Sequence, residues 1–258
     1  MWRHVDSSVR GTSHEATGAP CQDYCAGRVV PTPGGPVLVV AVADGAGSAS
    51  HSEVGARLAV ETFVERAEAQ LMGSPTLAIE SLYDDARARV IAEARALGVA
   101  PRELACTLLS AVVGPGWAAF AQVGDGAIVF DGPEGHQLAF WPDNGEYANT
   151  TRFLTDADHP RHLRVDRLDR PVAELALLSD GIQMLALDYT NARVHGAFFA
   201  PMFRTLREAA DLGVLQASLA AFLGSPRVNG RTDDDKTLFL ATRDPEPVDA
   251  DDAPDTPA

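Results

Sequence analysis

The stretch Val37-Leu38-Val39-Val40-Ala41-Val42-Ala43-Asp44-Gly45-Ala46-Gly47 decides the fold that we expect for this chain. Seven apolar residues, most of them small or β-branched, run directly into an aspartate and a glycine. Such a run is typical of a strand buried on both faces, and it is short for a helix. We expect the strand to carry the Asp44 carboxylate out of the sheet, because Gly45 allows the chain to turn there.

The same pattern of a buried strand followed by an aspartate recurs twice and then appears once in reverse. The three stretches are Phe120-Ala121-Gln122-Val123-Gly124-Asp125-Gly126, Leu175-Ala176-Leu177-Leu178-Ser179-Asp180-Gly181, and Asp233-Asp234-Asp235 ahead of Thr237-Leu238-Phe239-Leu240. Asp-Gly is a common turn dipeptide, so a plain turn explains any single instance. The set predicts strand ends that meet at one edge and form a carboxylate cage for divalent metal.

Carboxylates crowded at one edge repel each other and some become neutral unless a cation compensates their charge. Hard oxygen ligands without nearby His or Cys favour Mg²⁺ or Mn²⁺ over zinc. Two such ions about 3.5–4 Å apart can hold a hydroxide between them and bind a phosphate oxygen. The pattern therefore indicates hydrolysis by a metal-bound nucleophile, without a covalent enzyme intermediate.

Composition excludes several classes of partner. The net charge of −15 argues against nucleic acid and against anionic membranes, which both require basic patches. No apolar run reaches the ~18 residues of a membrane span. The first residues lack the apolar region of a signal peptide, so we expect a cytoplasmic protein. The spacing of the three cysteines matches no zinc-site pattern, so we expect reduced thiols at Cys21, Cys25 and Cys106.

Residues 1–243 are expected to form one α+β domain with two antiparallel sheets face to face and helices outside. Residues 244–258 form an acidic Pro/Ala tail that we expect to be disordered. We expect strands over 7–13, through 29–30, and over 37–43, 106–113, 117–123, 127–130, 137–141, 175–179 and 237–241. The four strands from 106 to 141 are expected to form one antiparallel meander, and residues 11–20 to form a loop.

Helices are expected over 51–71, from Ser74-Pro75 to Gly98, and over 182–187, 198–210 and 214–223. Ser50 and Glu53 have the spacing of a capping box at the start of the first. In the second, serine would be the N-cap and Gly98 the terminator. Residues 142–170 show no strong period and are interpreted as an irregular excursion at the sheet's end, in the position of a flap.

The order of these motifs resembles that of the metal-dependent serine/threonine protein phosphatases of type 2C. The residues that carry the resemblance are Asp23, Asp44-Gly45, Cys106-Thr107, Val123-Gly124-Asp125, Ser179-Asp180-Gly181 and Asp234-Asp235-Lys236-Thr237. Gly11-Thr12-Ser13-His14 with Cys21-Gln22-Asp23 resembles a bacterial branch of that family. The resemblance covers roughly residues 6–242 and implies a four-layer α-β-β-α sandwich, with two metal ions in the cleft between the sheet edges.

The resemblance also implies a role for each acidic position. Asp44 would bridge two ions of Mg²⁺ or Mn²⁺, and the Gly45 carbonyl would bind one of them. The remaining assignments are Asp180 and Asp234 on the other ion, Asp23 acting through metal-bound water, and Asp125 with Asp180 at a weaker third site. Asp235 would accept hydrogen bonds from groups next to the metal ligands, without binding an ion itself. The sequence leaves open whether Asp234 or Asp235 is the ligand. Asp233 would face solvent.

Three positions depart from the family pattern. Gly18 stands where the family often has a phosphate-holding Arg; Arg10 or His14 would supply that charge, or have a plain loop role. Ala46 stands where the family often has a His proposed as general acid. His51 is a candidate substitute, with a surface role as the simpler alternative, and loss of a general acid predicts slow turnover. Gln22 replaces an acidic residue and reduces the negative charge.

The implied function is a phosphoserine/phosphothreonine protein phosphatase that opposes a kinase. Its partner would be a phosphorylated protein, a kinase or its target, and the chain is expected to be a monomer. The first alternative is a weakly active or inactive regulatory module on the same fold, because Gly18 and Ala46 replace Arg and His. A metal hydrolase acting on other esters is the second. Gly45-x-Gly47-Ser48 is incomplete as a phosphate-binding P-loop.

Overall fold

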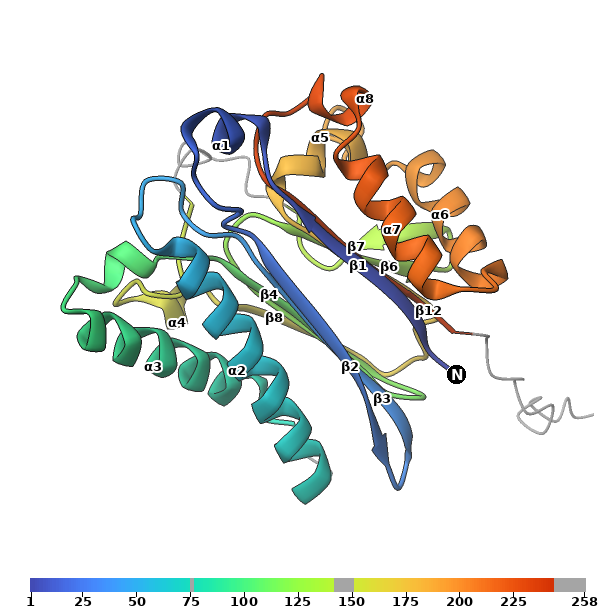
Figure 1. The fold of residues 1–258 in the computed structure, drawn as a ribbon. Coiled ribbons are helices and arrows are strands. Elements are labelled where there is room, and N and C mark those ends of the chain that lie inside the picture. The colour runs from blue at the N-terminus through green and yellow to red at the C-terminus, as the bar shows by residue number, and fades with distance from the viewer. Residues whose placement is uncertain (75–76, 142–150, 244–258) are drawn as a thin grey trace, which may run out of the picture.

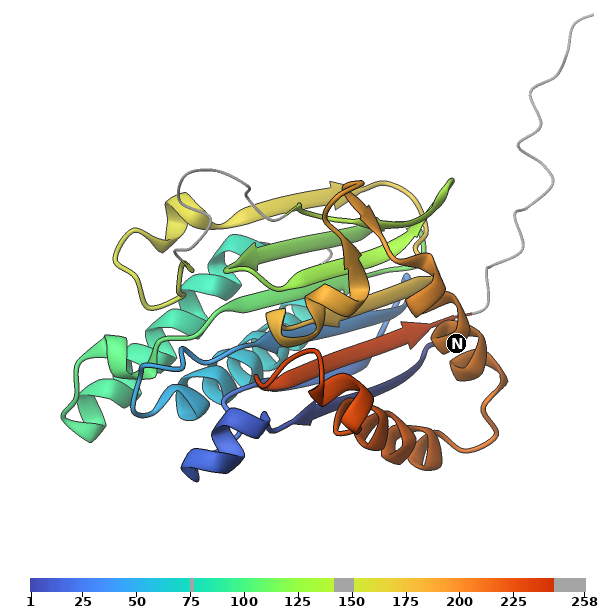
Figure 2. The ribbon, with the colours of Figure 1, turned by 90° about the horizontal axis from the view of Figure 1, so that it is seen from above.

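Two antiparallel sheets lie face to face, and helices cover their outer faces (Figures 1 and 2). We describe a computed structural model, which places residues 1–74, 77–141 and 151–243. The expected tail, 244–258, and the part of the expected excursion at 142–150 lie outside the described residues. The α+β class and the four-layer α-β-β-α arrangement are both confirmed.

Each of the two main sheets has five strands. The first follows the order β2 (Tyr24–Thr32), β3 (Gly35–Ala43), β4 (Leu108–Val113), β5 (Ala118–Val123) and β8 (Arg164–Leu168). The second follows the order β1 (Arg3–Val9), β12 (Lys236–Thr242), β9 (Glu174–Leu178), β6 (Ala127–Gly132) and β7 (Gly135–Leu138). β10 (Leu187–Asp188) and β11 (Arg193–Val194) form a separate two-stranded ribbon.

The long helices form the two outer layers. Helices α2 (Ser52–Gly73) and α3 (Ile79–Leu97) cover the first sheet, and α6 (Gly196–Glu208) and α7 (Leu212–Leu223) cover the second (Figure 1). The short ones are α1 (Thr12–Thr17), η1 (Pro101–Leu104), α4 (His159–His162), η2 (Asp180–Ile182), α5 (Gln183–Ala186) and α8 (Pro226–Asn229). Among the described residues, no helix is long and apolar enough to cross a membrane.

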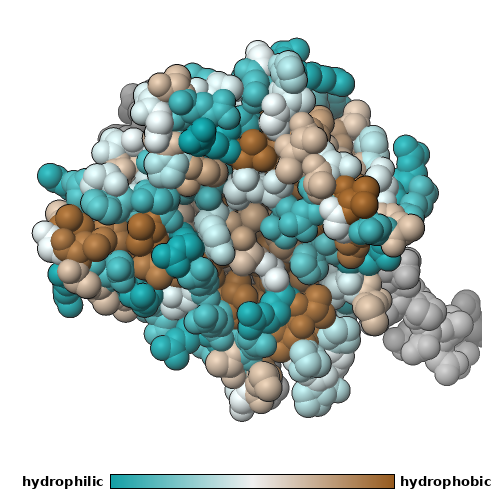
Figure 3. Space-filling model, in the orientation of Figure 1, coloured by the Kyte–Doolittle hydropathy of each residue, from teal (hydrophilic) through white to brown (hydrophobic). Residues whose placement is uncertain are grey.

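Three apolar clusters hold the four layers together. One packs α2 and α3 on the first sheet, one packs α6 and α7 on the second, and the third fills the space between the sheets. Strand β3 contributes to two of them, because alternate residues such as Val39 and Val40 face opposite sides and both are fully buried. Because most apolar side chains are buried in these clusters, hydrophilic side chains cover most of the face seen in Figure 3, with separate apolar patches.

The expected single meander is wrong, because β6 does not pair with β5. β4 pairs with β5 as predicted, but β5 then pairs with β8, whereas β6 pairs with β7 and β9 in the other sheet. The chain therefore crosses between sheets at Gly124-Asp125-Gly126. β8 lies within the stretch expected to be irregular, so that part of the expectation is also wrong. This crossing places Asp125 between the two sheets' ends.

Two helix starts and the N-terminal segment also differ from expectation. The first strand spans Arg3–Val9 rather than 7–13, and the expected loop contains α1. The capping box does not form, because the Ser50 hydroxyl donates to Glu103 Oε2 (3.0 Å) instead of capping α2. Helix α3 begins at Ile79, not at Ser74-Pro75, although it ends at Gly98 as predicted, with φ of +71°.

Candidate functional site

The strand-end aspartates meet around one cavity of about 140 Å³. Its described lining includes the acidic residues and the glycine singled out from the sequence, Asp44, Gly45, Asp125, Asp180 and Asp234. Four segments bring them there: the loop after β3, the crossing between β5 and β6, the turn after β9, and the segment before β12. The segment before β2 adds Gln22 to the lining. Asp44, Asp180 and Asp234 therefore line one cavity, and their role as metal ligands stays a prediction.

Asp44 is fixed by two backbone contacts with Thr107. The Asp44 N–H donates to the Thr107 hydroxyl (2.9 Å), and the Thr107 N–H donates to the Asp44 carbonyl (2.8 Å). On the other side of β3, the Gly45 N–H donates to the Gln22 carbonyl (3.1 Å) in the segment before β2. A Cβ at Gly45 would lie 2.7 Å from the Ser52 Cβ, so only glycine allows this close approach of chains.

Asp23 does not line the cavity, but its charge acts on Asp44, and the residue is 5 % exposed. The Ser179 hydroxyl donates to its Oδ2 (2.6 Å), while its Oδ1 is buried without a described partner. Asp180 Oδ1 is buried and unpartnered in the same way. Orphaned carboxylate oxygens are costly to bury, and two of them beside one cavity indicate a cation-binding role.

The electrostatics of the carboxylates agree with that interpretation. Burial first, and then the charges of Asp23, Asp180 and Asp234, raise the pKa of Asp44 well above its ordinary value. Burial, and then the charge of Asp125, raises the pKa of Asp180 to about 6. Burial raises the pKa of Asp23 to about 7, against the hydrogen bond from Ser179. A divalent cation would lower all three by favouring the ionised forms.

The donor set fits hydrated Mg²⁺ or Mn²⁺ better than zinc. It consists of carboxylate oxygens and a glycine backbone, with no His or Cys side chain among the described lining. Within residues 1–74, 77–141 and 151–243, no group of three or more acidic, His or Cys side chains forms a ready-made site for one ion. Mg²⁺ keeps several water ligands and is usually held by one or two carboxylates. The separation of the acidic side chains is therefore compatible with hydrated ions that are shared between them.

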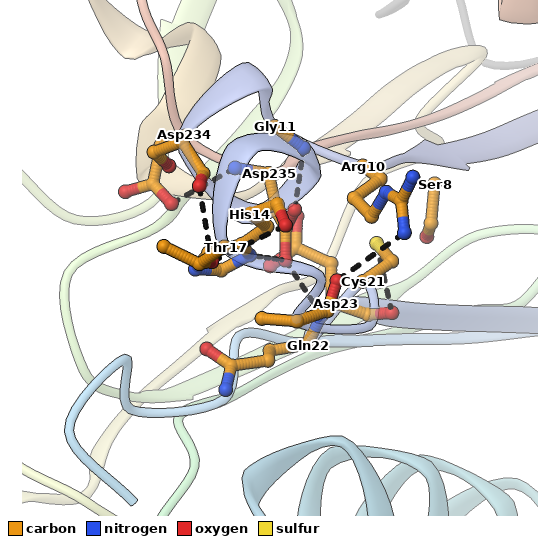
Figure 4. A network of polar contacts seen from close by, with 12 residues as sticks. Ser8, Arg10, Gly11, His14, Thr17, Cys21, Gln22, Asp23, Asp234 and Asp235 are labelled. Carbon is orange, nitrogen blue, oxygen red and sulfur yellow. Dashed lines mark hydrogen bonds and ion pairs between the residues drawn. The ribbon is translucent and has the colours of Figure 1, made fainter.

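Asp235 has a different role from its neighbour Asp234. Asp235 is 2 % exposed and accepts the backbone N–H groups of Gly11 and Gln22, both at 2.6 Å. His14 Nδ1 lies 2.9 Å from its Oδ2 (Figure 4). It therefore joins the start of α1 to the segment that carries Asp23. Asp234 is exposed and lines the cavity, whereas Asp235 does not line it.

The three residues expected to supply charge or a proton do not line this cavity. Arg10 donates to the Ala19 carbonyl, His14 faces Asp235, and His51 Nδ1 contacts the Ser50 hydroxyl (2.8 Å). Gly18 is exposed at the end of α1 with φ of +76°, a conformation that favours glycine over any side chain. Their expected roles stay predictions.

Sequence reasoning missed two lining residues, Thr151 and Phe153. Both fall in the stretch interpreted as an excursion at the sheet's end, where no periodic pattern marked them. Thr151 donates to Asp125 Oδ2 (2.6 Å) and thereby restrains that carboxylate.

Comparison with known proteins identifies similar chains. The model of a family described as protein phosphatase 2C matches residues 10–224. Serine/threonine-protein phosphatase 3 of Escherichia coli (strain K12) is 40 % identical over 247 residues, which cover 93 % of this chain and 98 % of that protein.

Solved structures share the fold. Serine/threonine phosphatase Stp1 from Staphylococcus aureus matches with a TM-score of 0.62 and 15 % identity, over 95 % of this chain and 96 % of that one. The catalytic domain of the serine threonine protein phosphatase PstP, in complex with two manganese ions, matches with a TM-score of 0.61 and 14 % identity, over 93 % and 97 %.

Proposed function

This chain belongs to the protein phosphatase 2C family, and we propose that it dephosphorylates a protein at phosphoserine or phosphothreonine in this cavity, opposing a kinase. It is a metal-dependent serine/threonine protein phosphatase. The proposal concerns the ligands, the ions and the partner. The observation that carries it is the convergence of Asp44, Asp125, Asp180 and Asp234 on one cavity.

We assign two ions, Mg²⁺ or Mn²⁺, to Asp44, the Gly45 carbonyl, Asp180 and Asp234, with Asp23 acting through water. A weaker third site would use Asp125 and Asp180. When bound, such ions supply activation of the attacking water and neutralisation of the charge on the phosphoryl oxygens.

The chain's own contribution is to fix these oxygens before substrate arrives. Thr107 holds Asp44 through two hydrogen bonds, and Ser179 holds one oxygen of Asp23. Ser179 in turn accepts the Thr237 N–H (3.0 Å), which links Asp23 to the start of β12. Such preorganisation matters because small misplacements of reacting groups are expensive in rate.

The cellular setting forms part of the same proposal. We place the reaction in the cytoplasm, in bacterial signalling, with a phosphorylated protein as substrate and the chain as a monomer. The three cysteines are free, as suits a reducing compartment. The acidic surface offers no support for a nucleic-acid partner.

Hydrolysis of a small aryl phosphate and of a phosphothreonine peptide, titrated with Mn²⁺ and Mg²⁺, tests the proposal. Asp44→Asn should reduce kcat/KM by at least about 10³-fold, since it removes a charge from the shared ligand. Asp233→Asn is the matched control, because Asp233 is exposed and its side chain has no described contact. Equal activity of wild type and Asp44→Asn, or activity that survives EDTA, would contradict the assignment. Metal binding without turnover in wild type would favour the weakly active or inactive regulatory module.

A further inference from the structure

The cavity presents almost no side-chain donor to a phosphorylated substrate. Apart from the acidic residues and Gly45, its described lining consists of Ala46, Gly47, Phe153, Thr107, Thr151 and Gln22. Among the described residues, no Arg, Lys or His lines it. Bound cations offset only part of the charge of a phosphate dianion beside four carboxylates, so hydrogen-bond donors are needed as well.

The two threonines already have other partners. The Thr107 hydroxyl accepts the Asp44 N–H and keeps its own O–H proton, and the Thr151 hydroxyl donates to Asp125. Both side chains therefore position acidic residues. Among the uncharged polar side chains of the described lining, Gln22 is the one with no described hydrogen bond.

The backbone of Gln22 is locked from two sides. Its N–H donates to Asp235 Oδ2 (2.6 Å), and its carbonyl accepts the Gly45 N–H (3.1 Å). These contacts tie Gln22 to the segment before β12 and to the loop after β3, the two segments that also carry Asp234 and Asp44. The position of the Gln22 side chain is consequently coupled to that of the acidic residues.

The Gln22 carboxamide is directed into the cavity without a protein partner. The residue is 7 % exposed, yet Oε1 is buried with no described hydrogen bond, and no described contact engages the amide nitrogen. Figure 4 shows the side chain pointing away from the Asp235 network. A Cβ built at Gly47, another residue of the cavity lining, would lie 4.0 Å from Oε1, which places the carboxamide beside that part of the lining. The orphaned Oε1 is an acceptor, whereas the amide nitrogen of the same group carries two N–H donors and has no described partner. The carboxamide therefore has donors free for a ligand in the cavity.

We propose that Gln22 is a substrate-binding residue whose carboxamide N–H donates to a phosphoryl oxygen, and that Asp235 is the positioning residue that holds its backbone. The inference rests on the proposed function, because it assumes that the phosphoryl group occupies this cavity. It accounts for glutamine, rather than an acidic residue, directly before Asp23. A carboxylate there would attract cations more strongly and repel the phosphoryl oxygens.

Two substitutions test this role from opposite directions. Gln22→Ala removes the donor, and Gln22→Glu keeps the shape and the backbone contacts but replaces the donor by a negative charge. For either variant we expect the KM for aryl phosphate and the inhibition constant of inorganic phosphate to rise about 10-fold or more, the usual effect of losing a hydrogen bond to a charged group. For Gln22→Glu we expect half-activation at lower Mn²⁺ concentration.

Isothermal titration of inorganic phosphate into the Mn²⁺-supplemented protein gives a readout independent of turnover. We expect weaker phosphate binding by both variants. Gln216→Glu on α7 is the matched control: Gln216 is exposed outside the cavity, and its replacement adds the same charge without touching the site. It should behave as wild type.

The outcomes separate this inference from the proposed function. If wild type shows no Mn²⁺-dependent hydrolysis, the proposed function fails first. If wild type is active and both Gln22 variants keep KM, phosphate inhibition and phosphate binding within twofold, Gln22 does not contact the phosphoryl group. Tighter Mn²⁺ activation in Gln22→Glu with unchanged phosphate binding would also overturn the inference, because Gln22 would then act on the ions alone.

Discussion

Replacing Asp235 should destabilise the fold, whereas replacing its neighbour Asp234 should leave stability nearly unchanged and reduce activity. Asp235 is buried and accepts two buried backbone N–H groups, from Gly11 and Gln22. In Asp235→Ala both N–H groups lose their acceptor at a cost of about 1–3 kcal/mol each, so we expect a loss of about 2–6 kcal/mol. For a domain of this size that corresponds to a fall in Tm of about 5–20 °C.

The assay is thermal unfolding in EDTA, followed by Mn²⁺-dependent hydrolysis at a temperature where every variant is folded. Asp235→Asn keeps one acceptor oxygen and should lose about half as much stability. Asp234→Asn preserves the Oδ1 that accepts the Asp235 N–H (2.8 Å), so its Tm should stay within about 2 °C of wild type while its Mn²⁺ activation weakens. A Tm of Asp235→Ala within 2 °C of wild type would refute the reasoning, and so would full activity of Asp234→Asn.

Two further predictions concern the close packing and the charge of the site. Gly181→Ala would place a Cβ 1.9 Å from the Asp235 carbonyl oxygen, so the turn after β9 must move. We expect a loss of about 1–3 kcal/mol and a large fall in kcat, whereas Gly116→Ala, which meets nothing within 4 Å, should match wild type in both assays. The site carboxyls have raised pKa values in the folded state, so between about pH 4 and 7 the metal-free folded protein binds more protons than the unfolded chain, and its unfolding free energy falls as pH rises. Mn²⁺ should therefore raise Tm more at pH 8, where the site carboxyls are ionised, than at pH 5. An equal rise in Tm at both pH values would contradict the raised pKa values of Asp23, Asp44 and Asp180.

The sequence predicts the central strands and their acidic ends because those signals are local. A run such as Val37–Ala43 is buried on both faces whichever sheet it joins, and its apolar pattern shows that directly. Pairing is not local in the same way. β6 follows β5 after three residues, with a turn sequence that suits a hairpin, yet it joins the other sheet. Gly126 shows why the crossing is possible: a Cβ there would lie 2.6 Å from the Leu178 carbonyl oxygen on β9.

Missed elements have comparable physical reasons. Three of the five residues of β8, Arg164–Leu168, are charged, and the strand lies at the edge of its sheet, so its apolar signal is weak. α1 has no buried residue, so no apolar stripe marks it. The Ser50–Glu53 capping box is absent because Glu103, distant in sequence, offers Ser50 a carboxylate that the local pattern does not reveal.

The same distinction between local and long-range signals explains which part of the site was open to prediction. Aspartates at strand ends belong to repeated local motifs, so their convergence follows once the strands are assigned to facing sheets. The contact of Asp235 with Gln22 joins residues 213 positions apart, and no local pattern encodes it. This contact explains why the two neighbouring aspartates differ. Asp235 faces the N-terminal segment as a buried acceptor, and Asp234 lies at the cavity. Because that contact also fixes the Gln22 backbone, any substitution that displaces Asp235 should weaken phosphate binding even where the metal ligands are intact.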